Sequence, residues 1–191
     1  MLSEIDERNV ARAVLAEIGR TVEKISPRQL TGAVELISSS ERVFLAGVGR
    51  SALGIRGFAM RLMHMGKSAY VVGDVTTPGI SCGELLIIGS GSGRTASLLA
   101  IAQKARQIGA RILLITISRQ CPIGKLADSV IEIRAPSPKA TDARTGARSV
   151  QPMGSLFEQA MFILLDSLVL LLMKGQALTS DEMFTRHANL E

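Results

Sequence analysis

The chain of 191 residues has few aromatic side chains: five Phe, one Tyr and no Trp. Proteins that bind single-stranded nucleic acid stack bases on aromatic rings, and this sequence has too few for such a platform. Its formal charge of +5 comes from 22 Lys and Arg against 17 Asp and Glu, scattered along the chain. A modest positive charge favours anionic ligands in general. We therefore expect no nucleic-acid partner and a small anionic ligand.

Cysteine and histidine are also scarce, with two of each. Cys82 and Cys121 lie far apart and form no Cys-x-x-Cys pattern, which fits unpaired thiols in a reducing cytoplasm. With only His64 and His187 besides, a zinc site is not expected. His64 has apolar neighbours on an expected helix, which indicates a packed histidine, and His187 stands at a chain end where polar residues fray.

Long apolar runs are missing as well. Residues 1–20 carry four acidic side chains among their apolar residues, which is unlike a signal peptide. The most apolar run, 161–173, has 13 residues and is interrupted by Asp166 and Ser167. A membrane-spanning helix needs about 20 apolar residues. We therefore expect a buried helix here and no membrane partner.

Short apolar runs alternate with helical patterns along the chain. The expected strands are 42–48, 69–72, 84–89, 111–117 and 130–133. The expected helices are 4–24, 27–37, 51–65, 95–108, 155–174 and 180–184, with Gly175 placed to end the fifth. This alternation predicts an α/β protein, a three-layer sandwich in which a five-stranded parallel sheet carries helices on both faces, as in flavodoxin-like folds.

The length suits one domain with a full core. Its expected parts are N-terminal helices in 1–40, the sheet core in 41–134, a loop in 135–153, and C-terminal helices and a tail in 154–191. The loop region from Arg134 carries a basic excess, with Lys139, Arg144 and Arg148 against Asp142 alone. It is either a solvated loop or a rim that attracts phosphorylated substrates.

Two expected strand-to-helix turns are rich in glycine and hydroxyl groups. The first is Gly47-Val48-Gly49-Arg50-Ser51, and the second is Ser90-Gly91-Ser92-Gly93-Arg94-Thr95. In an open parallel sheet, ligands bind beyond the carboxyl ends of the strands, where such turns lie. Backbone N–H groups at a helix N-terminus favour an anion such as phosphate, and the hydroxyls can donate to its oxygens. Tight turns with capping hydroxyls are an equally good interpretation.

The first turn also fits a dinucleotide-binding fingerprint, with Gly47, Gly49 and Ala52 at its three positions and Asp74 as the ribose acid. A nicotinamide-binding protein is therefore an alternative. The hydroxyl-rich second turn argues against it, since a dinucleotide site does not need a second phosphate cradle.

Glu158 has two competing interpretations. Ser155-x-x-Glu158 matches a capping box, and on spacing alone the cap is the favoured role. The other role is a general base at a substrate carbon, for which a carboxylate suits aldose–ketose chemistry. The roles compete because a helix N-terminus stabilises the anion.

Four segments carry a resemblance to a known family: GVGRSALGIRGFAMRLMHMG (47–66), GSGSGRT (89–95), QPMGSLFEQ (151–159) and MFTRHANLE (183–191). They closely resemble the bacterial and archaeal 6-phospho-3-hexuloisomerases, which are single sugar-isomerase (SIS) domains. The resemblance runs from about residue 42 to the end and is weaker over the first forty residues. The turns are shared widely among SIS proteins, whereas the last two segments are specific to this group.

The resemblance implies conversion of D-arabino-hex-3-ulose 6-phosphate to fructose 6-phosphate through a cis-enediol, in formaldehyde fixation by the ribulose monophosphate pathway. It implies no cofactor or metal, a homotetramer, and a functional link to hexulose-phosphate synthase. Glu158 would transfer the proton, and His187 would act as an acid, base or hydroxyl ligand, delivered by the tail into a neighbouring subunit's site. The substrate would be bound by residues of the two turns: Gly49, Arg50, Ser51, Ser90, Gly91, Ser92 and Thr95.

One position departs from the family pattern. Many relatives have an acidic residue where this chain has Arg94. If Arg94 points outward nothing changes, and if it points inward it should tighten phosphate binding. Two further alternatives stay open: a noncatalytic SIS module that senses a sugar phosphate, and an isomerase acting on a pentose or heptose phosphate.

Overall fold

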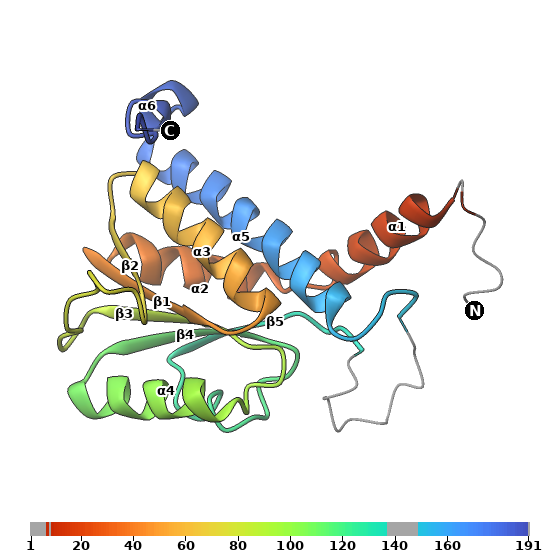
Figure 1. The fold of residues 1–191 in the computed structure, drawn as a ribbon, viewed down its shortest axis with the longest axis horizontal. Helices are drawn as coiled ribbons and strands as arrows, with labels where there is room; N and C mark the ends of the chain where they lie inside the picture. The colour runs from red at the N-terminus through yellow and green to blue at the C-terminus, as the bar shows by residue number, and fades with distance from the viewer. Residues whose placement is uncertain (1–6, 8, 137–148, 191) are drawn as a thin grey trace.

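A five-stranded parallel sheet forms the middle layer of the molecule (Figure 1). The computed structural model describes residues 7, 9–136 and 149–190. The strands are β1 (Arg42–Gly47), β2 (Ser68–Val71), β3 (Leu85–Gly89), β4 (Arg111–Thr116) and β5 (Ser129–Glu132), in the order β2-β1-β3-β4-β5. All five predicted strands are confirmed. Because the chain adds β2 on one side of β1 and β3 on the other, the strand order reverses at β1.

Helices cover the two faces of the sheet unequally (Figure 1). One face carries α4 (Ala96–Ile108), and the other carries α1 (Val10–Val22), α2 (Pro27–Ser38), α3 (Arg50–His64) and α5 (Ser155–Gln176). The short helix α6 (Ser180–Phe184) follows α5. The predicted three-layer sandwich is therefore confirmed.

The strands are buried on both faces, which explains their unbroken apolar runs. In β1, Val43 and Leu45 pack into the larger core beneath α1, α2, α3 and α5, whereas Phe44 and Ala46 pack into the smaller core beneath α4. This alternation follows from the two-residue period of a strand.

Helix α5 is longer than its sequence pattern predicted. It runs for 22 residues, long and apolar enough to cross a membrane by length and composition, so the length argument against a span was wrong. Half of its most apolar stretch of 18 residues is buried inside the protein. Leu164 and Leu168 of this helix lie in the larger core. The prediction of a buried helix is confirmed.

The end of α5 also differs from the prediction. The helix passes through Gly175, and Ala177 takes the left-handed conformation with φ of 52°. Leu178 then donates its N–H to Met173 O at 3.0 Å and packs against the larger core. This apolar contact after the helix fixes where it ends.

Two other predictions depend on residues beyond the described ones. Residues 4–6 and 8 of the predicted first helix lie outside them, and the described helix begins at Val10. Lys139, Asp142, Arg144 and Arg148 of the basic loop also lie outside the described residues.

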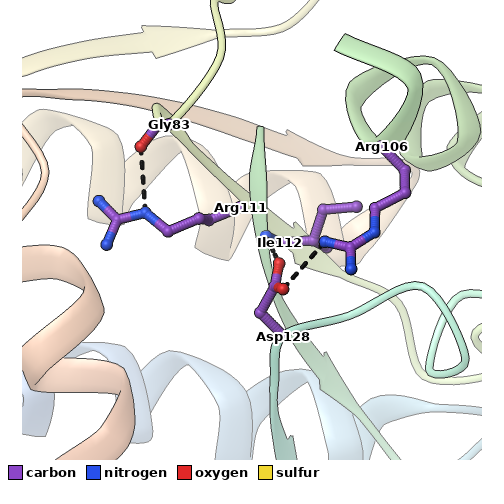
Figure 2. Close-up of polar contacts among 5 residues, drawn as sticks. All are labelled: Gly83, Arg106, Arg111, Ile112 and Asp128. Carbon is purple, nitrogen blue, oxygen red and sulfur yellow. Dashed lines mark hydrogen bonds and ion pairs between the residues drawn. The ribbon is translucent and has the colours of Figure 1, made fainter. Parts of the chain in front are cut away.

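The amino ends of the strands are closed by polar contacts within the protein (Figure 2). Asp128 accepts hydrogen bonds from Ile112 N at 2.7 Å and from Arg106 Nη1 at 2.9 Å. Arg111 Nε donates to Gly83 O at 3.0 Å. These contacts tie the starts of β4 and β5 to α4 and to the chain before β3.

Candidate functional site

A cavity of about 550 Å³ lies at the opposite edge of the sheet, beyond the carboxyl ends of β1 and β3. This is where the strand order reverses, the place at which open parallel sheets bind ligands. Its walls come from three segments: the turn after β1, the turn after β3, and the start of α5. Eight of the nine predicted site residues line it: Gly49, Arg50, Ser51, Ser90, Gly91, Ser92, Thr95 and Glu158.

The first wall is the turn into α3. Gly49 takes φ of 58°, a conformation that side chains rarely adopt, and α3 begins at the next residue. A Cβ at Gly47 would lie 3.1 Å from Ala52 Cα, so the glycine allows α3 to pack closely on β1. Arg50 and Ser51, the first two residues of α3, therefore line the cavity.

The second wall is the hydroxyl-rich turn into α4. Ser90 Oγ accepts a hydrogen bond from Gly93 N at 3.2 Å, and Ser92 Oγ accepts one from Arg94 N at 3.3 Å. Because each oxygen is used as an acceptor, its own O–H can donate to a ligand oxygen. The hydroxyls therefore brace the turn, as the tight-turn interpretation predicts, and they also line the cavity, whereas phosphate binding by them stays a prediction.

Glycines allow this second turn to pack tightly. A Cβ at Gly91 would lie 3.1 Å from Phe157 Cδ1, and one at Gly93 would overlap Cys121 Sγ. Thr116 Oγ1 and Ile117 N both donate to Gly91 O at 3.1 Å. The turn is thus held between β4 and α5 by contacts within the protein.

The third wall is the start of α5, where Arg50 joins two helices. Its Nη1 atom donates to Ser155 Oγ at 2.9 Å and to Glu158 Oε2 at 3.0 Å. The predicted capping box of Ser155 and Glu158 is therefore wrong. Gly154 is the residue before the helix and has no side chain to act as a cap, and Ser155 is already the first helical residue. Ser155 Oγ and Glu158 Oε2 instead both accept from Arg50. A capping box does occur in the chain, between Thr179 and Glu182 at α6.

This cavity is lined by residues from the N-terminal ends of three helices, α3, α4 and α5. Each helix N-terminus carries unpaired N–H groups and about half a positive charge. With the guanidinium of Arg50, they make the cavity attractive to a phosphate group. The side chain of Glu158, only 22% exposed, is the carboxylate in the wall.

Two further candidates lie away from the cavity wall. Arg94 is exposed and does not line the cavity, which supports the outward orientation. Asp74 pairs with Arg56 at 2.7 Å and does not line the cavity either, so it is not placed as a ribose acid there.

His187 is the one predicted site residue that does not line the cavity of its own chain. Its ring stacks on His64, with 5.5 Å between centroids, at the far end of α3. A helix of 15 residues is roughly 22 Å long, so α3 separates this pair from the cavity. His64 is packed as predicted, with only 3% of its surface exposed. Burial, then the charges of Arg61 and His187, lower the pKa of His64.

Sequence reasoning missed several cavity residues, among them Ile117, Met153, Ser155 and Phe157. Met153 has φ of 54°, a conformation usually left to glycine. No sequence signal predicts it. Ser155 could have been found, since it lies within the PMGSLFE segment that carried the resemblance.

Comparisons with known proteins show the family of this chain. A family model described as the SIS domain matches residues 36–162. The chain is 43% identical to the 3-hexulose-6-phosphate isomerase of Bacillus subtilis, over 93% of this chain and 95% of the relative. It is 41% identical to the enzyme of that name from Mycobacterium gastri, over 97% and 92% of the two chains.

A solved structure is also similar over almost its whole length. It is a Methanococcus jannaschii protein, whose structure infers a molecular function of 3-hexulose-6-phosphate isomerase. The TM-score is 0.82 at 33% identity, covering 95% of this chain and 98% of the other. The chain belongs to the SIS domain family, and within it to the sugar-phosphate isomerases.

Proposed function

We propose that the protein interconverts D-arabino-hex-3-ulose 6-phosphate and fructose 6-phosphate, with no metal or cofactor. The observation that carries the proposal is the cavity, in which a hydroxyl-rich turn, three helix N-termini and one carboxylate face the same space. The names of the curated relatives support this substrate over a pentose or heptose phosphate.

Proton transfer begins at Glu158. Its carboxylate takes the proton from C2 of the 3-ketose, the C–H electrons form a C2–C3 double bond, and the C3 carbonyl electrons move to its oxygen. The resulting cis-enediol loses the O2 proton as the C2 carbonyl forms, and a proton is delivered to C3. Arg50 holds the carboxylate through its 3.0 Å contact, and as a cation lining the same cavity it would stabilise the enediolate charge.

The phosphate group fixes the carbon chain against this carboxylate. Ser51, Ser90, Ser92 and Thr95 line the part of the cavity formed by the two turns, and Glu158 lines the part formed by α5. Binding the phosphate there turns proton transfer into a positioned, unimolecular step. Glu158 in the α5 wall then faces the carbons instead of the phosphate.

The substrate itself removes one chemical requirement. A 3-ketose phosphorylated at O6 cannot close a five- or six-membered hemiketal ring, so the forward reaction needs no ring-opening group. Fructose 6-phosphate does cyclise, so only the reverse reaction needs one. If His187 opens rings, His187→Ala should slow the reverse reaction more than the forward one at saturating substrate.

His187 would act in a neighbouring subunit of a homotetramer. What supports this is its position beyond the far end of α3 from its own cavity, together with its place on the C-terminal tail. A dilution series that follows both mass and turnover tests it. Activity retained by a dissociated monomer would exclude the arrangement.

In the cell, the reaction would follow a hexulose-phosphate synthase in the cytoplasm and complete formaldehyde fixation. A coupled assay tests the function: ribulose 5-phosphate, formaldehyde and a synthase generate the substrate. Fructose 6-phosphate is then read through glucose-phosphate isomerase and an NADP-linked dehydrogenase. We expect signal that depends on the protein. No signal, despite thermal stabilisation by a sugar phosphate, would move the function to a different isomerase or a sensor.

A further inference from the structure

A buried carboxylate on α1 holds the chain just before the third cavity wall. Glu17 is only 9% exposed, and its oxygens accept three hydrogen bonds. Ser149 Oγ and Gln151 Nε2 donate to Oε2 at 2.8 and 3.1 Å, and Val150 N donates to Oε1 at 3.1 Å. Helix α1 lies outside residues 36–162, the part of the chain that matches the SIS domain model.

The three donors to Glu17 from residues 149–151 are neutral. No Lys or Arg among the described residues forms an ion pair with it. Burying a carboxylate is costly unless its oxygens are hydrogen-bonded, so the three hydrogen bonds hold residues 149–151 to Glu17. Ser149 Oγ also accepts from Gln151 N at 3.0 Å, which closes the segment on itself.

This segment leads directly into the cavity wall. Pro152 O accepts from Ser155 N at 3.1 Å, and Met153 between them takes its left-handed conformation. A non-glycine residue keeps such a conformation only where both ends of the turn are held. Glu17 holds one end, and the contacts of Arg50 with Ser155 and Glu158 hold the other.

We propose that Glu17 is a positioning residue for the isomerase reaction, acting through residues 149–154 to set the place of Ser155 and Glu158. The inference rests on the proposed function. It assigns α1 a role in the site, although α1 contributes no residue to the cavity lining. It also predicts that phosphate binding is affected less than proton transfer, since Gly91 O of the second turn accepts from Thr116 and Ile117 and not from residues 149–154.

The test compares Glu17→Gln, Gln151→Glu and the double variant that exchanges the two side chains. In Glu17→Gln, the amide keeps one acceptor oxygen, and its N–H groups must face at least one of the three donors, so the segment is held less tightly. We expect kcat to fall roughly tenfold to a hundredfold, with the KM for fructose 6-phosphate within about twofold of the wild type. The exchange variant restores a donor facing an acceptor and should recover most of kcat, which independent effects would not produce.

Ile18→Ala is the matched control, because Ile18 is a buried apolar neighbour on α1, whereas the hydrogen bonds to residues 149–151 are made by the side chain of Glu17. It should lower Tm while kcat stays within about twofold of the wild type. A wild-type kcat in Glu17→Gln, or an equal kcat loss in both variants, would overturn the proposal.

Amide hydrogen exchange of residues 149–155 separates this inference from the proposed function. Exchange there should quicken in Glu17→Gln and return toward wild type in the double variant. If the wild type proves inactive on the hexulose phosphate, the proposed function fails, but faster exchange still supports the positioning of the wall. Unchanged exchange would overturn it.

Discussion

The two edges of the sheet are built from similar residue types but are used differently. At the amino edge, charged side chains meet each other or the backbone: Arg42 pairs with Glu84 at 2.8 Å, and Asp128 accepts from Arg106 and Ile112. At the carboxyl edge, Arg50 and Glu158 also meet at 3.0 Å, but they do so in the wall of a cavity.

The difference shows how a parallel sheet separates stability from chemistry. The amino edge has its polar groups satisfied within the protein, so a ligand gains little by replacing them. At the carboxyl edge, helix N-termini and hydroxyl protons face an open space. An ion pair is therefore a poor indicator of role by itself, and its surroundings decide whether it stabilises the fold or serves catalysis.

The strongest test of this contrast changes one carboxylate at each edge. Glu158→Gln should lower kcat roughly 10²- to 10⁴-fold, the usual contribution of a general base, since the amide cannot take the C2 proton. Its Tm should stay close to wild type, because the amide oxygen can still accept from Arg50. Glu84→Gln should leave kcat within about twofold, because it weakens only contacts with Arg42 and Ser81, neither of which lines the cavity. Equal losses of kcat would erase the distinction between the edges.

The second test uses two glycines with positive φ, Gly93 at the carboxyl edge and Gly83 near the amino edge. Gly83→Ala should destabilise the fold by about 1–2 kcal/mol from backbone strain, since a Cβ there meets nothing within 4 Å. Gly93→Ala adds an overlap with Cys121 Sγ, so the loss should rise to about 3 kcal/mol or more. Urea unfolding gives both values. Equal losses would show that the close approach at Gly93 is relieved without cost.

The third test removes the Asp128 carboxylate. Asp128→Ala leaves Ile112 N without its acceptor and should cost roughly 1–3 kcal/mol in the free energy of unfolding. Because these contacts close the amino edge, kcat should stay near wild type in a turnover assay at a temperature where the variant is folded. A tenfold loss of kcat would mean that the two edges are coupled.

The smallest expected effect is a pH dependence at the amino edge, where His64 ends α3. Burial lowers the pKa of His64, so the folded state resists protonation. Above about pH 6.5 the histidine is neutral in both states and contributes nothing. As the pH falls below this value, the unfolded chain binds the proton first and the free energy of unfolding decreases. Unfolding curves between pH 8 and 5.5 should show the loss, and His64→Gln should reduce it. An unchanged slope in the variant would assign the effect to other groups.

Sequence patterns predicted much of this architecture, because strands buried on both faces form short apolar runs between helical segments. The two glycine turns were also predictable, since each follows a strand and precedes a helix. The sequence patterns did not predict which distant segments contact one another. Ser155 and Glu158 match a local capping box. In the structure both instead accept hydrogen bonds from Arg50, which lies 105 and 108 positions earlier in the chain. The contacts of Glu17 with residues 149–151 span a still longer separation, 132 to 134 positions. No local pattern marks them.

The most direct test of the central claim is the site of deuterium uptake when the protein is incubated with fructose 6-phosphate in D2O. Abstraction by Glu158 between C2 and C3 predicts deuterium at C3, detected by NMR, together with formation of the 3-hexulose 6-phosphate. Both should be lost in Glu158→Gln and kept in Glu84→Gln. Deuterium at C1 alone, or no exchange and no 3-hexulose 6-phosphate, would contradict the proposed reaction.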